Sequence, residues 1–279
     1  MAGVESLTLN LAIILSVVSV VVGLIALIAR GGQTAGKTKK RSVNPAIDAG
    51  SIIIMVLALV SLTVSIITRW IQAGHGPFSS MYEFEIGFAW GVLLIGLIFQ
   101  WKYKAAFMKI VSMIIAIALL LLALSQSSRV IPLVPALQQS YLLTAHVASA
   151  IIAYGTFTSG FAAAILYLIQ AKKNFSWMPT ADQLDDISYR AVLIGFPFLT
   201  LLIILGALWA NIAWGKYWSW DPKETASLVT WLFYVAYMHA SIMRKWKGSR
   251  AAILLIIGFA LVLFTFFGNY IFSGLHAYG

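Results

Sequence analysis

The sequence has no cysteine, and charged residues make up only 10% of its 279 residues. The first absence excludes disulfides and any thiol chemistry performed by the chain itself. The second excludes an ordinary soluble domain, in which about a quarter of the residues are charged. Acidic residues are scarcer still, 9 against 19 basic ones, so the formal net charge is +10.

Apolar residues fill the space that charge leaves: 61% of the chain is hydrophobic and the mean hydropathy is +0.91. Crossing a bilayer takes about 20 apolar residues in a helix, and lipid offers no partner for open backbone groups. The sequence therefore predicts an all-α, polytopic membrane bundle that forms one integral domain over residues 1–279. Eight spans are expected, near 7–29, 46–68, 84–100, 106–124, 142–170, 190–212, 224–243 and 251–272.

Basic residues are distributed unevenly between the two sides of this bundle. They concentrate in the connectors after the first, third, fifth and seventh spans, and the other side holds only Arg69, Arg129, Lys216 and Lys223. Because positively charged connectors stay in the cytoplasm, both termini and the connector after the sixth span are expected outside. The net charge is then a topology signal, and it does not indicate a nucleic-acid partner.

One segment matches a nucleotide-binding motif in its residues but not in its expected structural context. Residues 31–38, G-G-Q-T-A-G-K-T, fit the phosphate-loop pattern, which requires a buried strand before it and a helix after it. Here a membrane span precedes the pattern and further basic residues follow it. A basic cytoplasmic loop accounts for the sequence, so we expect no nucleotide site.

Residues 211–224, which we name the tryptophan loop, carry Trp214, Trp218 and Trp220 beside Asp221. Each indole favours apolar contact together with a partner for its N–H group. Such a loop must lie on a membrane surface, on another protein or on a flat apolar ligand. An aromatic belt at the membrane interface is the plainer explanation, although a belt spreads its aromatic residues over all the helix ends.

The four histidines fall into two groups. His75, His146 and His276 are predicted near the outer side, whereas His239 follows Glu224 by 15 residues, which is about 22 Å along a helix. An ionisable side chain at that depth marks a functional site by default. Outer histidines beside tryptophans suit a haem held by imidazoles, but they are equally explained as hydrogen-bonded interfacial residues. From the residues alone both interpretations stay open.

The segment W-G-K-Y-W-S-W-D-P-K-E-T, followed by V-T-W-L-F-Y-V-A-Y-M-H, resembles the WWD signature of the haem-handling proteins of cytochrome c biogenesis. Its D-P-K-E form is similar to the CcsA (ResC) branch of system II. Three further segments agree, G-H-G-P-F-S-S-M-Y-E-F, S-Y-L-L-T-A-H and F-G-N-Y-I-F-S-G-L-H-A-Y-G. Ala226 and Ser80 depart from the family pattern, outside the proposed ligands.

The resemblance implies a cytochrome c synthase (haem lyase) subunit that carries haem b to the outer face and presents it to Cys-x-x-Cys-His apocytochromes. It implies His146 and His276 as the catalytic pair, the two axial ligands of the iron at the outer site. It further implies that the porphyrin is bound by the tryptophan loop through Trp214, Trp218, Trp220 and Asp221.

The resemblance assigns His239 to a haem site inside the membrane, where the second ligand comes from a CcsB (ResB) partner. Apocytochrome c and a thioredoxin-like thiol reductant are further expected partners, beside the lipid bilayer itself. The expected home is the bacterial plasma membrane, ahead of the thylakoid membrane. The alternative function is a haem exporter, or a membrane haem-binding protein, without covalent attachment activity.

The two haem propionates need cations or hydrogen-bond donors at a membrane surface. We expect at least one of Lys216, Lys223, Arg129 and Arg69 to pair with a propionate. The alternative is that Lys216 and Lys223 are solvated or pair locally with Asp221 and Glu224.

Overall fold

The computed structural model describes residues 2–31, 45–76, 79–103, 106–130, 140–175 and 178–271. All regular structure in these ranges is helical, which confirms the all-α prediction. The helices are α1 (Ala2–Gly31), α2 (Pro45–Ala73), α3 (Met81–Tyr103), α4 (Ala106–Ser125), α5 (Ser140–Lys173), α6 (Ala181–Trp214), α7 (Pro222–Met243) and α8 (Ser249–Ile271).

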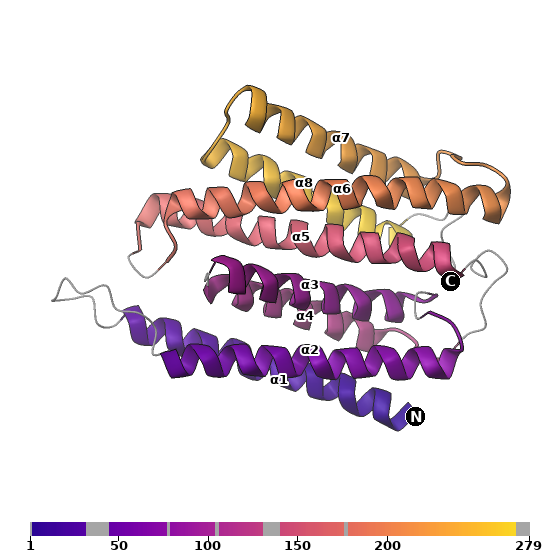
Figure 1. Cartoon of the computed structure of the whole chain (residues 1–279), viewed down its shortest axis with the longest axis horizontal. Coiled ribbons are helices and arrows are strands. Elements are labelled where there is room, and N and C mark those ends of the chain that lie inside the picture. The colour runs from indigo at the N-terminus through magenta and orange to yellow at the C-terminus, as the bar shows by residue number, and fades with distance from the viewer. Residues whose placement is uncertain are drawn as a thin grey trace.

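The helices lie side by side in successive pairs, as Figure 1 shows. Helix α1 packs on α2, α3 on α4, α5 on α6 and α7 on α8, and α5 also contacts α3 and α8. The start of α1, the end of α8 and the α6–α7 connection lie at one end of the bundle (Figure 1), which we name the tryptophan-loop end. Helix α5 is therefore central to the half of the bundle that carries the tryptophan loop.

All eight helices are long and apolar enough to cross a membrane. Large apolar side chains such as Leu7 and Ile53 are exposed on the outside of the bundle, 68% and 59% respectively, where lipid would cover them. The chain is an integral multi-pass membrane protein. Helix α6 begins at Ala181, ahead of the predicted 190, because a capping box of Thr180 and Gln183 starts the helix before its apolar part.

Close backbone approach and stacked aromatic rings hold the centre of the bundle together. A Cβ at Gly155 of α5 would lie 3.1 Å from the Gly91 carbonyl oxygen of α3, so the glycine permits the tight α3–α5 crossing. Two residues further along α5, Phe157 stacks on Tyr234 of α7 with 4.0 Å between ring centroids. These contacts fix α5 against α3 on one side and α7 on the other.

Candidate functional site

Two helix caps make the connection between α6 and α7 short. Helix α6 ends at Trp214 and is capped by Gly215, whose φ of 76° is left-handed and whose N–H donates to the Asn211 carbonyl at 2.9 Å. Helix α7 begins after Asp221, the N-cap residue, with Pro222 in the first turn. Only residues 215–221 lie between the helices, so three of the loop's aromatic residues, Tyr217, Trp218 and Trp220, are confined to a small space.

The Glu224 carboxylate fixes the shape of the tryptophan loop from inside. It is 8% exposed and accepts hydrogen bonds from the backbone N–H of Ser219 at 2.7 Å and of Asp221 at 3.3 Å. Trp220, between those two residues, has a φ of 58°, a conformation that costs free energy for an aromatic residue. These two hydrogen bonds, which we name the Glu224 clasp, hold this conformation. The Trp220 side chain is left 69% exposed at the surface.

The loop tryptophans form two edge-to-face pairs, and the pairs differ in position. Trp218 meets Trp220 with 5.9 Å between centroids and an angle of 87°. Trp214 meets the buried Trp209 at 4.9 Å and 80°. Of the three predicted porphyrin contacts, Trp218 lines a cavity, Trp214 packs at the end of α6, and Trp220 points to the surface.

The cavity lies where α5, α6, α7 and α8 meet the tryptophan loop. Its free volume is about 70 Å³, and it opens to the surface. Its walls combine an imidazole, aromatic rings, one lysine, one carboxylate and several hydroxyls; they include His146, Tyr154, Gly206, Tyr217, Trp218, Lys223, Glu224, Ser227 and Thr265. A cavity that is mostly apolar with a few placed polar groups is typical of a small-molecule site.

His146 of α5 is half-buried in this cavity and its ring is fixed by α6. Its Nδ1 lies 2.9 Å from the Leu202 carbonyl oxygen. Because a carbonyl can only accept, Nδ1 carries the proton, and the lone pair of the neutral ring lies on Nε2. Gly206 makes the contact possible, since a Cβ there would lie 2.9 Å from the Cε1 atom of His146. The ring is therefore set in the orientation and tautomer of a metal ligand.

The other histidines are separate from this cavity or outside the described residues. His276 lies beyond the described ranges. In the α2–α3 connection, His75 has its Nδ1 3.0 Å from the Gly76 carbonyl oxygen. His239 is exposed on the surface of α7 and is not among the cavity walls. The structure thus brings His146 and Trp218 together and keeps His239 apart from them.

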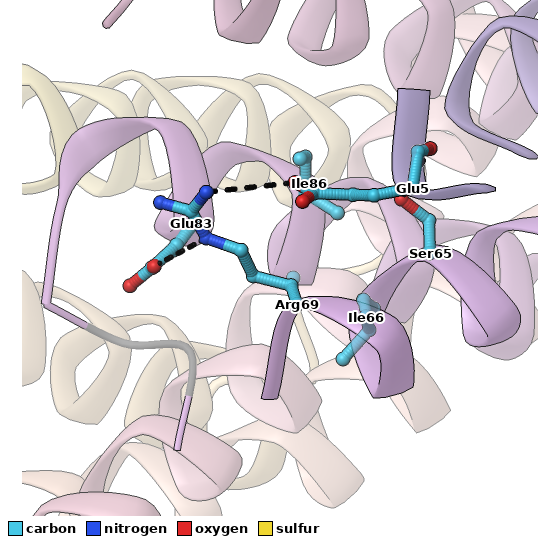
Figure 2. Close-up of a pocket in the computed structure, with 7 residues that line it drawn as sticks. Glu5, Ser65, Ile66, Arg69, Glu83 and Ile86 are labelled. Atoms are coloured by element: carbon cyan, nitrogen blue, oxygen red, sulfur yellow. Dashed lines mark hydrogen bonds and ion pairs between the residues drawn. The ribbon is translucent and has the colours of Figure 1, made fainter. Parts of the chain in front are cut away.

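Arg69 is committed to a buried cluster of charges, shown in Figure 2. Its Nε donates to Glu83 at 2.8 Å and its Nη1 lies 3.7 Å from Glu5, with both carboxylates buried. The remaining donors bond to the backbone carbonyls of Ser128 at 2.6 Å and Arg129 at 3.2 Å. Arg69 ties α1, α2, α3 and the segment after α4 together, so its guanidinium is not available to a ligand.

The three other basic side chains at this end differ in exposure. Lys216 and Arg129 are exposed, whereas Lys223 is half-buried and lines the cavity with His146. The Lys223 ammonium lies 5.9 Å from the centre of the Phe84 ring. In the described part of the chain, no carboxylate forms an ion pair with Lys223. The Lys223 ammonium interacts electrostatically with Asp221 without a close ion pair, and the Lys223 backbone N–H donates to Asp221 at 2.9 Å.

Sequence reasoning did not identify Gly206, the Leu202 carbonyl or Tyr154 as parts of the site. No local pattern marks them, because they meet His146 and the cavity only through the packing of α5 on α6. The Glu224 clasp, in contrast, could have been predicted from a local sequence pattern. D-P-K-E places Glu three residues after an Asp N-cap, which is the spacing of a capping box.

Comparison with known proteins identifies the family of this chain. The sequence profile of the family described as Cytochrome C assembly protein matches residues 78–276, which include the tryptophan loop and all of α3–α8. The cytochrome c biogenesis protein CcsA of Guillardia theta is 38% identical over 257 residues, covering 80% of this chain and 83% of that protein. CcsA of Chlamydomonas reinhardtii is 38% identical over 239 residues, covering 81% of this chain and 67% of that protein.

A solved structure shares the fold. Cytochrome c Heme Lyase CcmF superposes with a TM-score of 0.70 at 17% identity over 95% of this chain. The chain spans 46% of that larger protein. With the profile match and relatives aligned over most of their length, the chain belongs to the cytochrome c assembly family, within its CcsA group.

Proposed function

We propose that the protein acts in cytochrome c biogenesis by holding haem b at the tryptophan-loop end and presenting it for attachment to apocytochromes. The observation that carries this proposal is the placement of His146, whose Nδ1–H donates to Leu202 while its ring lines the cavity beside Trp218. Neutral imidazole with an oriented ring suits haem iron, and indole and tyrosine faces suit a porphyrin. Haem is here the substrate, and His276 is proposed as its second axial ligand.

The chain's part in the reaction is binding and orientation. In attachment, the S–H bond of an apocytochrome cysteine breaks, its sulfur bonds to one vinyl carbon of haem, and its hydrogen goes to the other. The two cysteines of a Cys-x-x-Cys-His segment react with the two vinyl groups in this way, and the segment's histidine replaces one axial ligand. Holding haem at one edge of the loop would raise the effective concentration of its vinyl groups. The protein itself needs no cysteine for these steps, in agreement with its composition.

The uneven distribution of basic residues supports the proposed outer position of the tryptophan-loop end and both termini. The bacterial plasma membrane is the proposed membrane. The partner proposal rests on His239. Its side chain is exposed at the bundle surface, and the other described histidines lie elsewhere, His146 in the cavity beside the tryptophan loop and His75 in the α2–α3 connection. A second ligand for haem at His239 would therefore come from another chain, which we propose is a CcsB (ResB) subunit. A thioredoxin-like protein that keeps the apocytochrome thiols reduced is the other proposed partner.

The test is covalent cytochrome yield in cells that express the chain, its CcsB partner and an apocytochrome reporter. His146→Ala and His276→Ala should each lower the yield, and added imidazole should partly restore it by filling the vacant coordination position. A reporter with Ser-x-x-Ser-His serves as the matched control, since it binds haem without thioether bonds. Wild-type yield in both histidine variants would contradict the proposed ligands. Haem release without any covalent product would favour an exporter instead.

A further inference from the structure

A half-buried ammonium in the cavity is left without a compensating ion pair. Lys223 is in the first turn of α7 and lines the cavity that also holds His146. A cation there is opposed by the helix dipole, whose N-terminal end is positive, and by the loss of water. Such an arrangement costs free energy, so it points to an anionic group that belongs next to Lys223.

The neighbouring carboxylates do not supply that group. Glu224 is occupied with the backbone of the tryptophan loop, accepting from Ser219 and Asp221. Asp221 caps α7 and interacts electrostatically with Lys223, but the two form no ion pair. The Phe84 ring is at the limit of a cation–π contact at 5.9 Å. An ammonium has three donors, and the described contacts leave them available to a ligand.

We infer that Lys223 is the anchor for one carboxylate of the tetrapyrrole that the cavity takes. The inference rests on the proposed function and deepens it. Of the four basic residues at this end, Arg69 is committed to Glu5 and Glu83, and Lys216 and Arg129 are exposed away from the cavity walls. Only Lys223 shares the cavity with His146. The two residues bind different parts of the substrate, the carboxylate and the iron, so their contributions can be measured separately.

The chemistry predicts which porphyrins depend on Lys223. A charge-assisted hydrogen bond in a partly buried site changes affinity roughly ten- to a hundredfold. Lys223→Gln should therefore weaken hemin binding by about that factor and should leave binding of hemin dimethyl ester, which has no free carboxylate, unchanged. Lys223→Arg keeps the charge and should retain most of the affinity. Lys216→Gln is the matched control, because it removes an exposed charge from the same loop.

The experiment titrates the purified full-length protein and its variants with hemin, hemin dimethyl ester and protoporphyrin IX. Iron-free protoporphyrin IX, followed by fluorescence, keeps both carboxylates and removes iron ligation. Its binding should fall in Lys223→Gln and stay unchanged in His146→Ala. Equal losses for hemin and its dimethyl ester, or no loss in Lys223→Gln, would overturn the anchor while haem binding stands. No loss would also be the outcome if Lys223 instead held a lipid phosphate. A wild-type protein that binds none of the three would overturn the proposed function and the anchor together.

Discussion

A single methyl group added at Gly206 should disable the His146 ligand without touching it chemically. The new Cβ would lie 2.9 Å from Cε1 and 3.2 Å from Nδ1 of His146, where ordinary contact begins at 3.4 Å. The ring must therefore move by a few tenths of an ångström, away from the Leu202 carbonyl. The 2.9 Å hydrogen bond would then lengthen beyond the usual range.

The size of the effect follows from the part this bond plays. Loss of a neutral hydrogen bond costs about 1 kcal/mol, and loss of the partner that orients a histidine ligand lowers metal affinity about 10- to 100-fold. We expect Gly206→Ala to lower hemin affinity by at least about tenfold. The substitution should favour the helix itself by up to about 1 kcal/mol, because alanine is the better helix former. Weaker haem binding could then not be attributed to a melted α6.

The assay is a hemin titration followed by absorption, in a double-mutant design with His146→Gly. When imidazole fills the space of the missing side chain, Gly206→Ala should have no further effect, since it acts through the His146 ring. Gly268→Ala is the control, a helical glycine in α8 with no atom of the described residues within 4 Å of the added Cβ. Unchanged affinity in Gly206→Ala, or an equal loss in the His146→Gly background, would refute the reasoning.

Three further outcomes are expected. Arg69→Leu should lower the free energy of unfolding by about 3–5 kcal/mol, because Glu5 and Glu83 stay buried without their partner. Loss of the exposed Arg190–Asp186 pair should lower it by less than about 1 kcal/mol. Thermal unfolding in detergent compares the two variants. Glu224→Ala should free the tryptophan loop, seen as faster hydrogen exchange at the Ser219 amide, and an unchanged rate would contradict the clasp. His239→Ala should reduce haem at the outer site without altering its absorption spectrum, and normal haem loading would leave His239 without a part in transit.

The helices could be predicted from the sequence because lipid allows few alternatives. Each apolar run had to be a helix, and the alternation of basic connectors tested their number. His146 and Trp218 could be proposed because their residue types suit haem and because their segments resemble a family. The charge cluster could not be predicted in this way, since Glu5 and Arg69 lie on different helices and meet only when α1 packs on α2.

The same limit applies within the site. Nothing near His146 in the sequence indicates that its partner is the Leu202 carbonyl on α6, or that Gly206 leaves room for the ring. The outward position of Trp220 also depends on a left-handed backbone conformation that Glu224 holds through Ser219 and Asp221. The residue types indicated the ligand, whereas the packing of the helices determines how each residue can contact it.

His146 is proposed to bind haem iron in the cavity beside the tryptophan loop. The most direct measurement is the absorption spectrum of haem bound to the purified complex, compared between the wild type and His146→Gly, with and without imidazole. The wild type should give a six-coordinate, low-spin spectrum that is lost in the variant and returns when imidazole is added. A variant whose bound haem keeps the wild-type spectrum in the absence of imidazole would contradict the claim.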